Sequence, residues 1–475
     1  MTRNLILAAA SLVALSACTV GPRYVSPVPA APSQAPFLEA AKSPAFSGEQ
    51  PPGPWWSLFG DPLLDDLVQQ ALTANADLRV AAANLAQARA VLREQRAGRL
   101  PTTTINANGT YARQPLTGAS ADIPGASAFK GETYDVGLDI GYQVDLFGRV
   151  ESAIRASRAD ADAVQAAFDL TRITVAAETT RAYSDICSYN RQIAVAEETL
   201  RIQQGTFDLT RRLFEGGRAT RLETGQAGAL LEQTRAAIPT LTAQRAAALY
   251  RLAVLTGKPP AEAPTAVLAC MAPPELNRPI PVGDGASLLA RRPDIRRAER
   301  QLAAAAARVN VATADLYPSI RLGGSIGSTA SAISGLGTSD SFRFSLGPLI
   351  SWNFPNMEVA RSRLKQAEAG ADGALATFDG AWLTALQESE SALATYAGEL
   401  DRLAALRRAA TEAGDAARIA RLRYQAGREN FQVVLDAERT LAAINASIAQ
   451  SEQARATNLV SLFLALGGGW QDGGA

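Results

Sequence analysis

The chain has 475 residues, of which 47% are hydrophobic and 19% are charged, and its 46 Lys and Arg residues balance its 46 Asp and Glu residues. This balance excludes the strongly basic surface expected of a nucleic-acid-binding protein. The sequence contains no histidine, so the commonest metal ligand and general base are both missing. It also lacks hydrolase and phosphate-loop motifs, and we expect no catalytic residue, no metal and no cofactor.

Residues 1–17 have the pattern of an export signal, with Arg3 ahead of an apolar run that is too short to span a membrane. The run ends in Leu15-Ser16-Ala17-Cys18, which resembles the bacterial lipobox, where the signal is cut before a lipidated cysteine. We expect Cys18 to carry lipid; an ordinary secretory signal that contains a cysteine is the alternative. Thr19 replaces the aspartate that favours inner-membrane retention, so the expected location is the outer membrane, with the protein extending into the periplasm.

Residues 18–54 are rich in Pro, Ala and Ser, which predicts an extended tether. The folded part opens at Trp55. Asp61 suits a helix N-cap and Pro62 the first helical position, so we expect a short helix to about residue 73 and a longer one over about 77–98.

Two strands are predicted next, at about 102–112 and 133–146. The second has the clearer pattern, because every second residue from Tyr134 to Val144 is apolar and the residues between are small or polar. One face of the strand is therefore apolar, and the other is polar and expected to contact water. The alternating stretch is longer than a typical soluble strand of about 5–6 residues. Its length suits a tilted membrane strand, which needs ~9–11 residues.

A very long helix is expected over about 149–214, because this stretch lacks proline, contains one glycine and is rich in helix formers. At ~1.5 Å per residue it would be about 100 Å long. Gly216-Gly217 is a helix C-cap signal, and a second helix follows over about 220–255. A linker with seven prolines occupies 257–285. We expect Cys187 and Cys270 to be unpaired buried thiols; a disulfide in an oxidising compartment is the alternative.

The pattern then repeats, so that repeat 1 spans 55–256 and repeat 2 spans 286–467, before a Gly-rich tail at 468–475. Asp294 follows Asp77, and Pro318 follows Pro101, at the same distance along the chain. The second set of elements comprises strands at about 319–329 and 341–352 and helices at about 356–424 and 430–466. The predicted fold class is mixed α and transmembrane β, internally duplicated, with four strands and long helices in each chain.

Four membrane strands cannot form a closed barrel, and open strand edges are not tolerated in lipid. The smallest bacterial barrels have about 8 strands, so several copies must combine. Eight strands leave an interior filled by side chains, whereas more strands leave a lumen. The small and polar residues of the wet faces suit a lumen, and we favour three copies with twelve strands over two copies with eight.

With these features the chain resembles the TolC-like outer membrane factors of tripartite efflux pumps, and among them the lipoprotein branch often labelled NodT. The resemblance covers nearly the whole mature chain and rests on a set of motifs: the lipobox, Trp55–Pro62, Arg292–Arg296, Leu316–Ile320, Tyr424–Gly427 and Val434–Ala437. It implies a homotrimer with a twelve-stranded β-barrel in outer membrane lipid, continued by a twelve-helix α-barrel. The implied partners are a periplasmic adaptor protein and an inner-membrane pump, commonly of the resistance-nodulation-division (RND) type.

The resemblance also implies roles for residues near the two helical turns. Asp436 would form a ring of three carboxylates at a periplasmic gate and favour cations; Val433 stands where relatives often have a second aspartate. Glu223 and Tyr424 would form a latch, with Arg421 or Arg428 as cationic partner, unless all these are solvated charges at a helix end. The expected adaptor contacts are Leu213, Gly217, Leu422 and Gly427, and the expected interfacial aromatic residues are Tyr111, Tyr142, Phe147 and Trp352.

The sequence therefore predicts a passive exit duct that conducts drugs or other small molecules out of the periplasm, and not an enzyme. One alternative is a duct for protein or peptide secretion. The other is a structural envelope lipoprotein that conducts nothing.

Overall fold

The computed structural model describes residues 20–29, 31–114, 129–276 and 278–468. The chain divides into two compact units, each assembled from separate segments. The first unit contains Leu85–Val164, Ala298–Phe378 and the N-terminal segment to Pro27. The second contains Val28–Asn84, Gln165–Arg297 and Asp379–Ala475. The expected signal at 1–17 and the expected lipid site at Cys18 lie outside the described residues.

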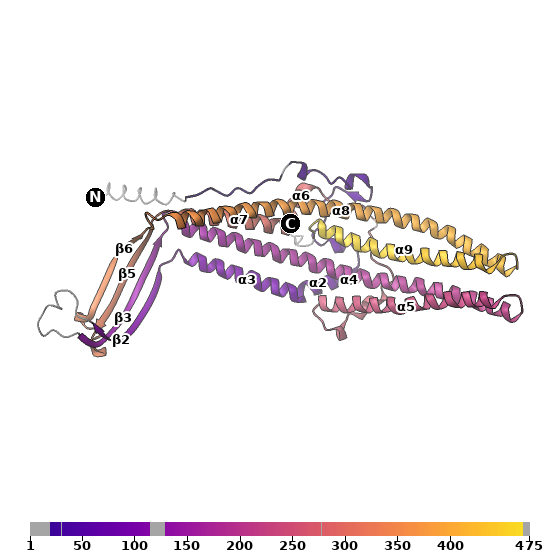
Figure 1. Cartoon of the computed structure of the whole chain (residues 1–475), viewed down its shortest axis with the longest axis horizontal. Helices are drawn as coiled ribbons and strands as arrows, with labels where there is room; N and C mark the ends of the chain where they lie inside the picture. Colours follow the sequence, from indigo (N-terminus) through magenta and orange to yellow (C-terminus); the bar gives the residue numbers. More distant parts are fainter. Residues whose placement is uncertain (1–19, 30, 115–128, 277, 469–475) are drawn as a thin grey trace. The chain divides into compact units, whose positions relative to one another are not determined.

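The first unit contains a four-stranded antiparallel sheet in the order β2-β3-β5-β6, with the strands side by side (Figure 1). The strands are β2 (Thr102–Gln114), β3 (Phe129–Val144), β5 (Ser319–Ala330) and β6 (Phe342–Ser351). The register places Leu138 opposite Ile105 on one side and Ile326 on the other, so apolar residues share a face. β2 and β6 are the edge strands of this sheet.

The other face of the sheet carries hydrogen-bonded polar side chains. Asp135 of β3 accepts hydrogen bonds from Arg343 Nη2 of β6 at 2.8 Å and from Thr329 Oγ1 of β5 at 2.6 Å. Asp139, four residues further along β3, accepts one from Asn106 Nδ2 of β2 at 2.5 Å. The two faces therefore differ in polarity as the period-two pattern predicts.

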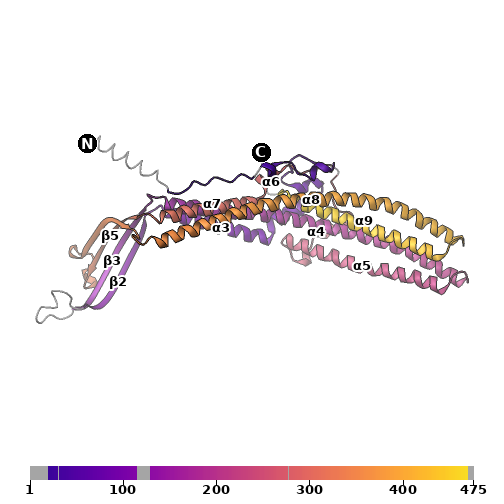
Figure 2. The same ribbon diagram turned by 45° about the horizontal axis from the view of Figure 1, so that its top comes forward.

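Two helices are far longer than the others: α4 (Arg149–Glu215) has 67 residues and α8 (Glu358–Gln425) has 68. Each turns back into a 35-residue helix, α5 (Arg221–Leu255) after α4 and α9 (Phe431–Ala465) after α8. Both views of the chain show α5 lying beside α4 and α9 beside α8 (Figures 1 and 2). Among the described residues, the other α-helices are α2 (Pro62–Ala74), α3 (Ala76–Ala97), α6 (Gly285–Arg291) and α7 (Pro293–Ala314). Among the described residues, no helix combines the length and apolarity needed to cross a membrane.

The start of the second unit is fixed by caps and aromatic packing. Asp61 caps α2 by accepting from the backbone N–H groups of Leu63 and Leu64, so the predicted N-cap is confirmed. Asp61 also accepts a hydrogen bond from the Tyr183 hydroxyl of α4. Trp55 is fully buried and stacks on Phe463 of α9, with ring centroids 4.8 Å apart.

The Arg-Pro-Asp segment at the start of α7 anchors the end of α9. Arg292 is buried and donates to the Ala465 carbonyl at 2.7 Å, and it pairs with Asp294 at 2.6 Å and Glu388 at 2.7 Å. Burial alone would raise the pKa of Asp294, but the hydrogen bonds and charge of Arg292 outweigh this effect and lower the pKa. The segment is therefore a structural joint within the second unit.

Part of the segment expected to be a tether is folded onto the second unit. Phe37 and Phe46 are buried, and the backbone N–H of Leu38 donates to Glu390 at 2.7 Å. β1 (Phe46–Ser47) pairs in parallel with β4 (Ile280–Pro281), which lies in the expected linker. Short 3₁₀ turns also lie in the described connections: Ala31–Gln34, Ala40–Lys42, Trp55–Phe59, Pro260–Glu262, Thr265–Ala269, Ile333–Gly335 and Ser339–Ser341.

The prediction that Cys187 and Cys270 are unpaired thiols is wrong, because a disulfide joins them. The bond ties the proline-rich linker to α4. Asn190, one turn further along α4, donates to the carbonyls of Leu268 at 3.1 Å and Cys270 at 2.8 Å, and accepts from Arg245 of α5 at 2.9 Å. This contact depends on tertiary docking of the linker, which the spacing of the cysteines does not indicate.

Candidate functional site

The turns of the two helical hairpins have the same backbone design. After α4, the N–H of Arg218 donates to the Leu213 carbonyl at 2.7 Å; after α8, the N–H of Arg428 donates to the Arg423 carbonyl at 2.9 Å. The residue before each arginine is a glycine in the left-handed region, Gly217 with φ 70° and Gly427 with φ 68°. This pattern is a Schellman helix end, which reverses the chain in few residues.

Side-chain caps start the return helices. Thr220 caps α5 by accepting from the N–H of Glu223 at 3.3 Å, and the Glu223 carboxylate accepts from the N–H of Thr220 at 2.6 Å. This reciprocal pair is a capping box. Asn430 caps α9 by accepting from the N–H of Val433 at 3.1 Å. Glu223 thus has a structural role that is separate from the latch predicted for it.

Near the turns the two hairpins share one hydrophobic cluster, which draws on all four helices. Tyr424 of α8 and Phe431 of α9 pack with ring centroids 5.5 Å apart. The other buried members are Ala227, Leu230, Ala420, Val434 and Leu435, and the partly buried ones are Phe207, Leu209, Leu213 and Ala437. This tip cluster holds the α4/α5 hairpin against the α8/α9 hairpin within one chain.

A buried ion pair lies beside the tip cluster and was missed by the sequence analysis. Glu438 of α9 has a side chain that is 3% exposed, and its Oε1 accepts from Arg421 Nη2 of α8 at 2.8 Å and Arg421 Nε at 3.1 Å. The same oxygen accepts from Thr206 Oγ1 of α4 at 2.7 Å. We call these three residues the junction. The sequence does contain an indication of the junction. Glu438 continues the helical i, i+3, i+4 spacing of the apolar residues of α9, and an acid at such a position is a candidate for a buried ion.

The predicted latch residues lie near each other, but Arg421 pairs with Glu438 and not with Glu223. Burial raises the pKa of the Tyr424 phenol, and the nearby charge of Glu223 raises it further. Within the described part of the chain the buried Tyr424 hydroxyl has no hydrogen-bond partner. The structure therefore brings Glu223 and Tyr424 within electrostatic range without joining them by a hydrogen bond.

The remaining predicted site residues lie at or near the turns. Asp436 is exposed on α9 and accepts a weak hydrogen bond from Gln432 Nε2 at 3.4 Å. Gly217, Leu422 and Gly427 are exposed, whereas Leu213 packs against the tip cluster. The exposed apolar side chains here include two that the sequence analysis did not single out, Phe214 and Leu222; Leu222 is 69% exposed and Leu422 is 55% exposed.

Replacing Gly217 with alanine is expected to destabilise the first turn by about 1 kcal/mol, because a Cβ makes the left-handed conformation unfavourable. None of the described residues has an atom within 4 Å of that Cβ, so the effect comes from the backbone alone. Hydrogen exchange at the turn amides measures this loss of stability, and the expected result is a roughly fivefold increase in local opening.

Gly225→Ala is the matched control, because Gly225 lies inside α5 and its added Cβ would also have no atom of the described chain within 4 Å. It should leave opening unchanged or reduce it, since alanine favours helix over glycine. Equal exchange in the Gly217→Ala protein and the unmodified protein would contradict the backbone argument.

Known proteins match this chain over nearly its full length. The family model for the outer membrane efflux protein matches residues 67–258 and 286–468. Outer membrane protein OprJ of Pseudomonas aeruginosa is 33% identical, over 97% of this chain and 94% of its own. Among solved structures, the outer-membrane channel OprN has a TM-score of 0.90 at 36% identity and covers 96% of this chain and 100% of its own. The open-state MtrE outer membrane channel of Neisseria gonorrhoeae has a TM-score of 0.81 at 28% identity, with 96% and 99% covered.

Proposed function

This chain belongs to the outer membrane efflux protein family, and we propose that three copies of it form a closed channel through the outer membrane. The channel is the exit duct of a tripartite efflux system and passively conducts drugs or other small molecules from the periplasm to the outside. The similar proteins OprN and MtrE are outer membrane channels, so we assign this chain no catalytic role.

The observation that carries the trimer is the pair of open sheet edges. Among the residues that the structure describes, β2 and β6 each have one unpaired edge, and they expose large apolar side chains, with Ile105 79%, Phe344 76% and Leu346 87% exposed. Lipid offers no hydrogen-bond partner to the backbone N–H and C=O groups of an open strand edge, so each edge requires a strand from another copy. Pairing β6 of one copy with β2 of the next gives twelve strands from three copies. The polar face with Asp135 and Arg343 then lines a water-filled lumen.

The mass of the detergent-solubilised complex, measured by light scattering with detergent correction, tests this proposal. Three times the mass of the mature chain is expected. Twice that mass would favour an eight-stranded barrel with a filled interior. A monomer would overturn the proposal, because four strands with open edges cannot remain in lipid.

The exposed helical turns and the expected export signal support a set of partners in the cell envelope. The exposed apolar side chains Leu222 and Leu422 suit contact with a periplasmic adaptor, together with the predicted contacts Leu213, Gly217 and Gly427. We propose an inner-membrane pump, commonly of the RND type, as the energy source. Lipid attached to Cys18 would add an anchor to the outer membrane, contributing about 0.8 kcal/mol for each buried CH₂ group.

Asp436→Ala is expected to lower the cation selectivity of the reconstituted channel several-fold. Three exposed Asp436 carboxylates around a narrow periplasmic entrance would attract cations and repel anions. Planar-bilayer reversal potentials in a potassium chloride gradient measure the change. Asp415→Ala is the control, because Asp415 is an exposed acid on α8 already paired with Arg418 at 3.1 Å. Unaltered selectivity in Asp436→Ala would remove Asp436 from the gate.

A further inference from the structure

The apolar face of the four-stranded sheet carries charge at one end. The alternation of β2 and β3 places Arg113 on the same face as Ile105, and Lys130 and Glu132 on the same face as Leu138. Among the described side chains of this face, in all four strands, these three are the charged ones. They lie at the end of the sheet that is remote from the connections to α3 and α4 (Figure 1).

Arg113 and Lys130 are directly opposite each other in the register of β2 and β3. Opposite side chains on neighbouring strands start only about 4.5–5.5 Å apart, and like charges in this position repel. Both side chains are exposed, and neither forms an ion pair with a described residue. An anion that contacts both cations would remove this repulsion.

The one acid nearby on this face is engaged elsewhere. Glu132 lies opposite Tyr111, one pair along from the two cations on the same face, and its Oε2 accepts a hydrogen bond from the Tyr134 hydroxyl at 3.0 Å. The carboxylate is therefore held toward Tyr134. The described part of the face thus leaves the two cations available to a ligand.

Two tyrosines indicate the level of this pair relative to a membrane. Tyr111 and Tyr134 lie between the cations and an apolar stretch of β3 made up of Val136, Leu138 and Ile140. Tyrosine is enriched where the hydrocarbon of a membrane meets its headgroups. Lys130 is four residues beyond Tyr134, roughly 13 Å along the strand. The cations therefore lie on the headgroup side of the tyrosines.

The choice of ligand rests on the proposed channel, in which the apolar face contacts lipid and the helices extend into the periplasm. The end of the sheet with Arg113 and Lys130 is then the outer one, and it meets the outer leaflet of the outer membrane. Lipid A, the glycolipid of that leaflet, carries phosphate monoesters. A phosphate monoester has a charge of about −1.5 to −2 at pH 7 and three acceptor oxygens, which suit an arginine and a lysine together.

We propose that Arg113 and Lys130 of each copy bind one phosphate monoester of lipid A at the outer rim of the barrel. Pairing of β2 with β6 of the next copy leaves the site open, because strand pairing uses the backbone edge and not the face of the sheet. The site is distinct from the gate predicted at Asp436 and from the helical turns.

The test is native mass spectrometry of the full-length complex in a neutral detergent, titrated with lipid A that carries both phosphates. The comparison lipid is the same acylated disaccharide without phosphates. The unmodified protein should bind the phosphorylated lipid about tenfold more tightly or better. Arg113→Gln/Lys130→Gln should weaken that binding by about tenfold and change binding of the unphosphorylated lipid by less than about twofold. Phosphatidylglycerol, a diester with one charge, should bind the unmodified protein several-fold more weakly than lipid A.

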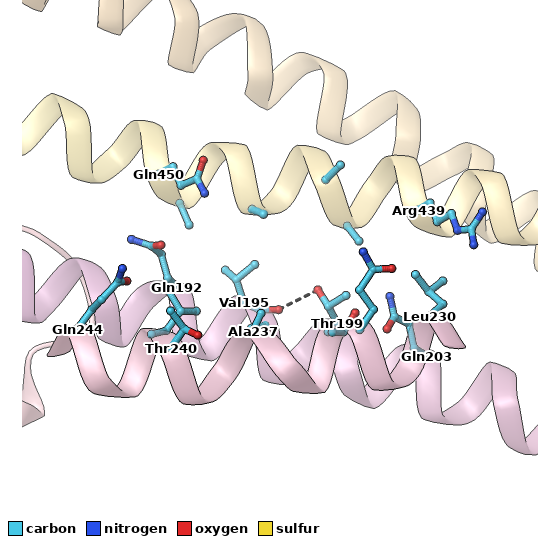
Figure 3. A pocket seen from close by; sticks show the side chains of 18 residues that line it. Gln192, Val195, Thr199, Gln203, Leu230, Ala237, Thr240, Gln244, Arg439 and Gln450 are labelled. Atoms are coloured by element: carbon cyan, nitrogen blue, oxygen red, sulfur yellow. Dashed lines mark hydrogen bonds between the residues drawn. The ribbon is translucent and has the colours of Figure 1, made fainter. Parts of the chain in front are cut away.

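Two control variants separate the site from general effects. Lys365→Gln/Arg439→Gln also removes one lysine and one arginine, both exposed and both outside the sheet, and should leave lipid binding unchanged. Lys365 lies on α8, and Figure 3 shows Arg439 on α9 beside a pocket between α4, α5 and α9. Arg113→Lys/Lys130→Arg keeps both charges and should retain lipid A affinity within about threefold, which distinguishes lost charge from a folding defect.

Three results would overturn the proposal. They are equal binding of the phosphorylated and unphosphorylated lipids, equal lipid A affinity in the unmodified protein and Arg113→Gln/Lys130→Gln, and phosphatidylglycerol binding as tight as that of lipid A. The same spectra report the number of chains in the complex. A complex that is not a trimer contradicts the proposed channel, whereas a trimer without a preference for the phosphorylated lipid contradicts this inference alone.

Discussion

Arg421→Ala is expected to destabilise the junction of α4, α8 and α9 by about 3 kcal/mol, because it leaves the Glu438 carboxylate buried without its cationic partner. Breaking a buried ion pair typically costs about 3–5 kcal/mol of stability, and the lower value applies here because Arg421 itself is 33% exposed. Glu438 would retain the Thr206 hydroxyl, which is too weak a partner to compensate for a lost guanidinium. The two hairpins should then separate more readily near their turns.

Hydrogen exchange measures this effect directly. Amides of α9 around Glu438 should exchange on the order of a hundredfold faster through local opening, since 1.4 kcal/mol corresponds to a factor of ten. If the junction also restrains the proposed gate, single-channel conductance in planar bilayers should rise. Exchange unchanged within about a factor of three would show that the pair contributes little to the junction.

Two control variants make the result specific to burial. Arg418→Ala removes an arginine one turn earlier on α8, where Arg418 and Asp415 are 61% and 62% exposed, and should change exchange little. Arg421→Met combined with Glu438→Leu removes both charges together. This double variant should be much closer to the unmodified protein than Arg421→Ala, because no buried charge remains unpaired.

Loss of the Cys187–Cys270 disulfide is expected to destabilise the second unit by about 4–5 kcal/mol. The two cysteines are 83 residues apart, and a cross-link across so long a loop removes much conformational freedom from the unfolded chain. In the Cys187→Ser/Cys270→Ser variant, thermal unfolding should begin at lower temperature. Limited proteolysis should cut the 257–285 segment first, because non-covalent contacts alone then hold it, among them the Asn190 hydrogen bonds, the β1–β4 pairing and the ion pair of Glu275 with Arg455.

A reducing agent provides the control for this prediction. It should lower the unfolding temperature of the unmodified protein to that of the double serine variant and should not affect the variant. Identical unfolding of the oxidised and reduced proteins would mean that the linker is held by its other contacts.

The sequence was sufficient to predict the elements whose cause is local. Period-two alternation indicated β3, and the absence of proline indicated α4, which ends at residue 215 against an expected 214. Gly217 and Gly427 marked the turns because a left-handed helix end favours glycine over every other residue. Asp61 was recognisable as a cap because a cap acts on the next few residues of its own chain.

Tertiary structure decided the features that join distant segments. The disulfide, the β1–β4 pairing and the buried junction each depend on which helix faces are brought together, and helical periodicity does not specify the neighbour. The resemblance drew attention to Asp436 and Glu223, yet the acid that is buried near the turns is Glu438, two residues beyond Asp436 on α9.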